Sequence, residues 1–144
     1  MNYVVGFLFD NHDESVLLVR KNKPEWQAGK LNGIGGKIEE NEDPLTAMHR
    51  EFAEETGIKD VDWKEFLKLE YGPICIWFFK ASINFGGVKY MSINDIGEYI
   101  EKWSYDKLNS RFPSSFTIPN LKWIIPLALD KDDCVANIKG SYNG

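Results

Sequence analysis

The sequence has few of the features that mark secreted or membrane proteins. It contains only two cysteines, Cys75 and Cys134, and no CxxC spacing, so neither a disulfide framework nor a redox pair is indicated. No apolar run approaches the ~18–20 residues of a membrane span. The first ten residues, MNYVVGFLFD, lack the basic start of a signal peptide and are better interpreted as a strand. We therefore expect reduced thiols, a cytoplasmic location and no membrane partner.

Positive charge is also scarce. The 17 Lys and Arg residues are outnumbered by 22 Asp and Glu, which gives a net charge of −5. This balance does not favour a nucleic-acid-binding surface, and no nucleic-acid partner is expected. A polyanionic small molecule would need metal ions, or a few well-placed Lys or Arg side chains, to make the local potential positive.

The chain has no internal repeat, linker or low-complexity tract, and its 144 residues are enough for one domain with a proper core. We expect a single domain over residues 1–144, and the sequence does not indicate the oligomeric state. Residue types and turn signals predict strands at Tyr3–Phe9, Ser15–Arg20, Val61–Tyr71 and Ile74–Ser82, a strand with a helical turn at Gly97–Leu108, and an edge strand at Cys134–Ile138. Short β structure is also expected at Val88–Met91, and a helix at Asn120–Leu129 that Pro126 should kink or shorten.

A second helix is predicted over Pro44–Thr56. Asp43 suits the N-cap and Pro44 the first helical position, whereas Gly57 suits the left-handed residue after the last turn. Leu45, Met48 and Phe52 share one stripe at i, i+3, i+7 spacing, and this stripe is expected to face the core.

The same helix carries three glutamates, Glu51, Glu54 and Glu55, directly after Arg50. At about 100° per residue, Glu54 and Glu55 lie within roughly 60° of Glu51, on opposite sides of it. Like charges at this spacing repel unless a cation offsets them, and Mg²⁺ prefers such oxygen ligands. A solvated acidic face is the simpler interpretation of a Glu-x-x-Glu-Glu run taken alone.

The residues before this helix favour the metal site. The run LNGIGGK, from Leu31 to Lys37, is interpreted as a glycine-rich loop that lets a backbone approach a ligand closely. Arg50 is expected to orient carboxylates through charged hydrogen bonds rather than to bind substrate. Trp26, in the polar connection before the run, would either cover the edge of the core or stack on a flat ligand. Glu98 and Glu101 are each a possible further ligand or an exposed charge.

Gly36 to Ile58 as a whole matches the pattern G-x5-E-x7-R-E-U-x-E-E-x-G-U, in which U is bulky and apolar. Every specified position is filled, namely Gly36, Glu42, Arg50, Glu51, Phe52, Glu54, Glu55, Gly57 and Ile58. This resembles the signature of the Nudix hydrolases, with Phe52 where an aliphatic residue is commoner. The resemblance implies an α/β/α sandwich with a mixed β-sheet. It also implies Mg²⁺-dependent, or Mn²⁺-dependent, hydrolysis of a nucleoside diphosphate linked to another group.

Site residues follow from this resemblance position by position. Glu51, Glu54, Glu55 and Glu98 become metal ligands together with the Gly35 carbonyl, and the general base is either Glu51 or Glu98. The run LNGIGGK is similar to that of Nudix enzymes acting on oxidised purine nucleoside triphosphates. On that similarity the residues expected to bind the nucleotide are Trp26, Asn32, Lys37, Phe116, Ile118 and Asn120. The chain departs from those enzymes at Ile118, Asn120 and Leu121, where they hold the base with a tryptophan and paired aspartates.

Three functions are compared. The first is a diphosphatase that converts a (d)NTP, an oxidised purine such as 8-oxo-dGTP among them, to monophosphate and pyrophosphate. The second keeps the chemistry but acts on ADP-ribose, a dinucleoside polyphosphate or a nucleotide sugar. The third is a non-catalytic nucleotide-binding module, against which the complete glutamate set argues. Glycoside cleavage by paired carboxylates is poorly served, because adjacent helical glutamates bind a metal more readily.

Overall fold

The computed structural model describes residues 1–84, 97–109, 117, 120–130 and 134–140. The strands are β1 (Asn2–Asp10), β2 (Ser15–Arg20), β3 (Leu31–Asn32), β4 (Ile34–Lys37), β5 (Lys64–Tyr71), β6 (Ile74–Ile83), β7 (Tyr99–Ser104) and β8 (Ala136–Gly140). The helices are the 3₁₀ turn η1 (Glu25–Gln27) and the α-helices α1 (Pro44–Thr56), α2 (Tyr105–Asn109) and α3 (Leu121–Leu129). No helix in these ranges is both long and apolar enough to cross a membrane.

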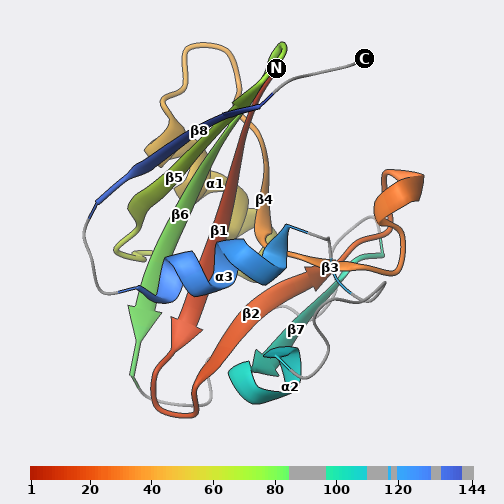
Figure 1. The fold of residues 1–144 in the computed structure, drawn as a ribbon, viewed down its shortest axis with the longest axis vertical. Helices are drawn as coiled ribbons and strands as arrows, with labels where there is room; N and C mark the ends of the chain where they lie inside the picture. Colours follow the sequence, from red (N-terminus) through yellow and green to blue (C-terminus); the bar gives the residue numbers. More distant parts are fainter. Residues whose placement is uncertain (85–96, 110–116, 118–119, 131–133, 141–144) are drawn as a thin grey trace.

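The described strands form one mixed sheet of eight, in the order β3-β2-β1-β6-β5-β8, with β4 on β1 and β7 on β2. β1 is the central strand (Figure 1), because β6 pairs with its whole length in parallel on one edge. On its other edge β4 pairs antiparallel with Tyr3 to Gly6, and β2 pairs with Phe9 and Asp10. β8 is parallel to β5, so the sheet contains both strand directions.

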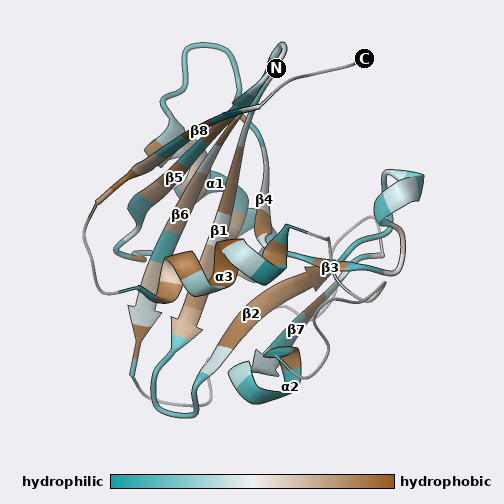
Figure 2. Ribbon diagram, viewed as in Figure 1, coloured by the Kyte–Doolittle hydropathy of each residue, from teal (hydrophilic) through white to brown (hydrophobic). Residues whose placement is uncertain are grey.

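A helix covers each face of this sheet, α3 in front and α1 behind in Figure 1. Side chains alternate along β1 and β2, as strand geometry requires. Phe7, Phe9, Val16 and Leu18 face the α3 cluster, whereas Val4, Leu8, Leu17 and Val19 face the α1 cluster. Both faces of these strands are therefore apolar, which accounts for the brown of β1 and β2 in Figure 2. The expected α/β/α sandwich with a mixed sheet is confirmed.

Two sequence-based expectations are wrong. The run LNGIGGK is not a loop, because β3 and β4 occupy most of it and pair with β2 and β1. Leu45 is not a core residue: its exposure is 44%. Ala47, Met48, Phe52 and Thr56 are the buried residues of α1, so the buried stripe is centred beside Leu45 rather than on it.

The other elements largely agree with expectation. β7 and α2 occupy the predicted Gly97–Leu108 segment, and β8 lies two residues later than predicted. Pro126 lies inside α3, and the helix ends three residues after it. The strand expected at Val88–Met91 falls outside the described residues.

Candidate active site

The ends of α1 are set by the predicted local signals. The Asp43 side chain accepts a hydrogen bond from the Thr46 amide at 2.8 Å, and Pro44 occupies the first turn. At the other end Gly57 has φ 78°, and its amide bonds to the Ala53 carbonyl. Because Met48 and Phe52 are buried against the sheet, the helix is fixed in rotation, and Glu51, Glu54 and Glu55 lie on its remaining surface.

Glu51 packs against the backbone of β4. A Cβ atom added to Gly36 would lie 2.5 Å from the Glu51 carboxyl carbon and 2.6 Å from each of its oxygens. Gly36 pairs with Val4 of the central strand, so this contact joins α1 to the middle of the sheet. A side chain at this position would displace the carboxylate, so glycine allows Glu51 to keep its present place.

Arg50 organises the acidic residues around it, as expected. Its guanidinium donates two hydrogen bonds to Glu42, at 2.8 and 2.9 Å, and one to Glu51 at 2.9 Å. A fourth bond reaches the Lys37 carbonyl at 3.1 Å. The two bonds from Arg50 to Glu42, with a smaller contribution from the Glu39 amide, lower the pKa of Glu42 to about 2. Arg50 thus ties the segment between β4 and α1 to the helix and orients Glu51.

The ionised form of the Glu55 carboxyl is poorly stabilised in the metal-free protein. One of its carboxyl oxygens is buried with no hydrogen-bond partner. Burial raises its pKa to about 7, against the lowering effect of Lys21 and with further raising by the charges of Glu98, Glu51 and Glu54. Burial also raises the pKa of Glu51, and Arg50 opposes that shift. A group of carboxylates that mutually oppose ionisation and include an unpartnered oxygen is a site that favours a cation.

Glu98 reaches this group from the start of β7. It is 1% exposed, and its oxygens accept bonds from the Asn22 amide at 2.8 Å and from the Lys21 ammonium. Glu101, the less favoured candidate, pairs instead with Arg20 and accepts a bond from the Trp103 indole. The structure therefore brings Glu98 to the helix glutamates and gives Glu101 a separate partner.

The donor set suits a hard divalent cation, since it offers several carboxylates and the unpartnered oxygen of Glu55. In their present rotamers, no three His, Cys, Asp or Glu side chains within the described ranges are close enough together to hold an ion. Binding would therefore require rotation of glutamate side chains. Glu54 is exposed and pairs with Arg50 at 3.5 Å, so its rotation toward an ion would break only this exposed ion pair.

A cavity of about 400 Å³ opens beside the glutamates. The residues that line it are Tyr3, Val4, Val5, Lys21, Pro24, Trp26, Gln27, Asn32, Gly33, Gly35, Gly36, Tyr71, Ile74 and Ile76. The structure thus brings three predicted site residues, Trp26, Asn32 and Gly35, to one cavity. Gly36 lies in its wall and also against the Glu51 carboxylate, so the cavity and the acidic group are adjacent.

Of the other predicted nucleotide-binding residues, the two that the structure describes, Lys37 and Asn120, do not line this wall. The Lys37 side chain is exposed, and its backbone carbonyl accepts the bond from Arg50. Asn120 lies just before α3 and does not cap the helix with its side chain. Phe116 and Ile118 fall outside the described residues. Between them, Thr117 forms a bridge to Leu31, which brings the chain at that point next to β3.

Comparison with known proteins decides the family. The model described as "NUDIX domain" matches residues 2–103, which include β1 to β6, α1 and most of β7. The chain belongs to the Nudix family. The resemblance inferred from the Gly36–Ile58 pattern is therefore confirmed.

Among relatives of this Nudix protein, an 8-oxo-dGTP diphosphatase of Escherichia coli K12 is 37% identical over 83 residues, or 55% of this chain and 64% of the relative. The match thus spans slightly less than two thirds of that relative. The fold is similar to that of the MutT protein from Bacillus halodurans, with a TM-score of 0.73, 21% identity and coverage of 98% and 89% of the two chains. It is also similar to the NUDIX domain of Shewanella oneidensis NrtR complexed with ADP ribose (TM-score 0.67, 17% identity, 89% and 85% coverage).

Sequence reasoning missed several residues of the Nudix cavity. Lys21 was not predicted as a site residue, although it lies in the wall and contacts Glu98. Tyr71 and Ile74 flank the Gly72-Pro73 turn between β5 and β6, and both line the cavity. The only local signal for these residues is their position at strand ends, where loops and sites gather.

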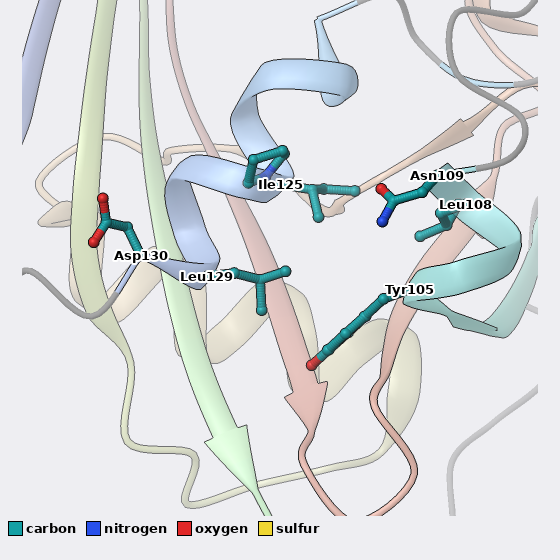
Figure 3. Close-up of a pocket in the computed structure, with 7 residues that line it drawn as sticks. Tyr105, Leu108, Asn109, Ile125, Leu129 and Asp130 are labelled. Carbon is teal, nitrogen blue, oxygen red and sulfur yellow. The ribbon is translucent and has the colours of Figure 1, made fainter.

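A second cavity, of about 360 Å³, lies between α2 and α3 (Figure 3). Its wall combines the Tyr105 ring with apolar side chains such as Leu108, Ile125 and Leu129. Its described lining includes none of the Nudix glutamates and neither Trp26 nor Asn32.

The pKa of Glu55 makes the metal-free stability of this Nudix domain depend on pH. Because the folded-state pKa is about 7 and the unfolded value is about 4.3, the folded state holds a proton that the unfolded chain releases. This stabilisation is complete below the unfolded value and is lost as the pH rises through 7. The free energy of unfolding is measured in chelator by urea titration. We expect the contribution of Glu55 to fall by up to about 3 kcal/mol as the pH rises from below the unfolded pKa to above the folded pKa. Glu55→Gln should flatten the profile, and an unchanged slope would contradict the assignment.

Proposed function

We propose that this Nudix protein hydrolyses a (d)NTP to nucleoside monophosphate and pyrophosphate with Mg²⁺, or Mn²⁺, as cofactor. An oxidised purine such as 8-oxo-dGTP is the first base to test. The observation that carries the proposal is that the cavity lies next to the acidic group. A cavity with an exposed tryptophan and an asparagine in its wall meets, at Gly36, the carboxylate of the signature glutamate Glu51. The identity with an 8-oxo-dGTP diphosphatase supports the choice of base.

The cavity suits a nucleobase. Trp26 offers a flat apolar surface at its rim, on which a purine can stack. The Asn32 side chain is already oriented, because its oxygen accepts the Gly33 amide at 2.7 Å and its nitrogen donates to Gln27 at 3.3 Å. A fixed amide of this kind can read a base edge by hydrogen bonding. Tyr71 and Ile76 complete an apolar wall.

The acidic group suits the triphosphate end once a cation is bound. Glu51, Glu54, Glu55, Glu98 and the Gly35 carbonyl are the residues that would hold it. The bound ion supplies charge neutralisation and a water of lowered pKa. The chain itself positions the reacting groups: Arg50 bonds to Glu51, and we expect the exposed Lys37 to contact phosphate oxygens. Glu51 or Glu98 takes the proton from the attacking water.

A substrate panel tests the proposal. Purified protein with fixed Mg²⁺ is offered dGTP, 8-oxo-dGTP, the other (d)NTPs, ADP-ribose, dinucleoside polyphosphates and nucleotide sugars. Monophosphate and pyrophosphate are then quantified. The proposal predicts the highest kcat/KM for a nucleoside triphosphate and strict dependence on the divalent ion. Preferential cleavage of ADP-ribose would favour the second function considered above, and binding without turnover would favour the third.

Trp26 should govern substrate binding rather than the chemical step. It is 61% exposed although it lines the cavity, so its removal costs little folding energy. We expect Trp26→Ala to raise KM by about tenfold, with kcat within about twofold, because stacking of one base contributes about 1–3 kcal/mol. Steady-state kinetics on the best substrate measure this.

Trp123→Ala is the matched control, since Trp123 is a second exposed tryptophan that lies on α3 and does not line this cavity. Its KM should match the wild type. An unchanged KM in Trp26→Ala would show that the indole covers the domain edge without meeting substrate.

A further inference from the structure

Lys21 lies where a cation is most needed in the metal-free site. Its ammonium is 3.2 Å from a carboxyl oxygen of Glu98, a side chain that is almost completely buried. A buried carboxylate without a positive partner is costly, because burial disfavours the charged form. The Asn22 amide also donates to Glu98, but an amide carries no net charge. The Lys21 ammonium is therefore a positively charged partner of Glu98.

The field of Lys21 extends beyond Glu98. Burial raises the pKa of Glu55, and the charges of Glu98, Glu51 and Glu54 raise it further, whereas the charge of Lys21 lowers it. Glu98 and Glu55 are both among the proposed metal ligands.

The backbone holds Lys21 in this place. It follows the last residue of β2, and its amide and carbonyl bond to the Lys30 carbonyl and the Gly29 amide, each at 2.8 Å. Alternation along β2 sends the preceding Arg20 to Glu101 and leaves Lys21 on the side of Glu98. A second cation among the same oxygens would be repelled by the ammonium at short range.

From this geometry we propose that Lys21 is a place-holder for the metal ion. Its ammonium neutralises Glu98 while the ion is absent, and it competes with the ion for this carboxylate. Lys21 is accordingly a positioning residue that holds the Glu98 carboxylate in place before the metal arrives. This inference rests on the metal site of the proposed function and assigns a new role within it.

Mn²⁺ binding without substrate tests the competition. Mn²⁺ affinity is measured by titration calorimetry and electron paramagnetic resonance on the wild type, Lys21→Met and Lys23→Met. Methionine keeps the length and apolar stem of lysine but removes its charge. Lys23 is exposed and forms no ion pair within the described residues, so Lys23→Met is matched in net charge. We expect Lys21→Met to bind Mn²⁺ about tenfold more tightly, with the other two proteins equal.

Thermal unfolding supplies a readout that a bystander lysine would not change. In chelator, Lys21→Met should melt about 5 °C below Lys23→Met, because Glu98 loses its charge partner. At saturating Mn²⁺ the gap should narrow, because the ion replaces the ammonium and stabilises the folded state by mass action. Lys21→Arg, which keeps the charge, should remain close to the wild type in both conditions.

The outcomes separate this inference from the proposed function. If the wild type binds Mn²⁺ but Lys21→Met binds it equally or more weakly, Lys21 is no competitor and this inference is overturned alone. If no variant binds Mn²⁺, the metal site and the place-holder are both overturned. A thermal gap that stays constant with Mn²⁺ would leave Lys21 a structural ion-pair partner only and would also overturn the proposal.

Discussion

Glu55→Gln should lower turnover by on the order of a thousandfold or more, with the fold intact. The side chain keeps its shape but loses the charge that a cation requires. Folding should not suffer, because burial already raises the pKa of the carboxyl to about 7 and one of its oxygens lacks a partner. The variant should melt at or above the wild-type temperature in chelator. Pyrophosphate release and circular dichroism measure the two effects.

Glu40→Gln provides the matched control. Glu40 precedes the same helix and is exposed, and it is not one of the specified signature positions. Its removal changes the net charge equally and should leave turnover within about twofold of the wild type, as for most exposed substitutions. Near-normal turnover in Glu55→Gln would remove Glu55 from the metal ligands.

Alanine substitution should have different effects at the neighbouring glycines Gly35 and Gly36. An added Cβ at Gly35 would lie 1.9 Å from the Val4 carbonyl oxygen, which belongs to the backbone of β1 and cannot move aside. The Cβ at Gly36 would instead meet the Glu51 carboxylate, the movable end of a side chain. We expect Gly35→Ala to destabilise the fold by about 3 kcal/mol or more. Gly36→Ala should remain folded and lose most of its activity, because Glu51 is displaced.

Gly140→Ala is the control for both variants, since its Cβ would make an ordinary contact of 3.5 Å with Tyr71. Urea titration and turnover are measured on all three proteins. If Gly36→Ala were as active as Gly140→Ala, the contact between Gly36 and Glu51 would have no part in catalysis.

The features that the sequence predicted correctly depend on neighbouring residues. Asp43, Pro44 and Gly57 define the ends of α1 through hydrogen bonds and dihedral angles of the helix itself, so a short stretch of sequence contains the necessary information. The same is true of Arg50, whose partners Glu42 and Glu51 lie within eight residues of it. The Gly36–Ile58 pattern combines these local constraints, which is why it indicates the family.

The features that the sequence did not predict depend on distant residues. The glycine run forms β4 because β1 is its partner, and nothing within the run indicates that pairing. Leu45 has the spacing of the buried stripe, but the tilt of α1 on the sheet decides which edge of the stripe is covered. Lys21 meets Glu98 from 77 positions away. Such a contact follows from the strand order, which a single sequence does not reveal.

The position of β4 also affects how the site loses activity when the protein unfolds. β4 is paired with β1, and β1 is paired along both edges. The amide protons of β1 should therefore exchange with solvent only when the whole domain opens. Gly36, which meets Glu51, is therefore paired with the strand that we expect to be the most protected, rather than lying in an unpaired loop. Heat or denaturant should then remove activity together with the fold and not before it.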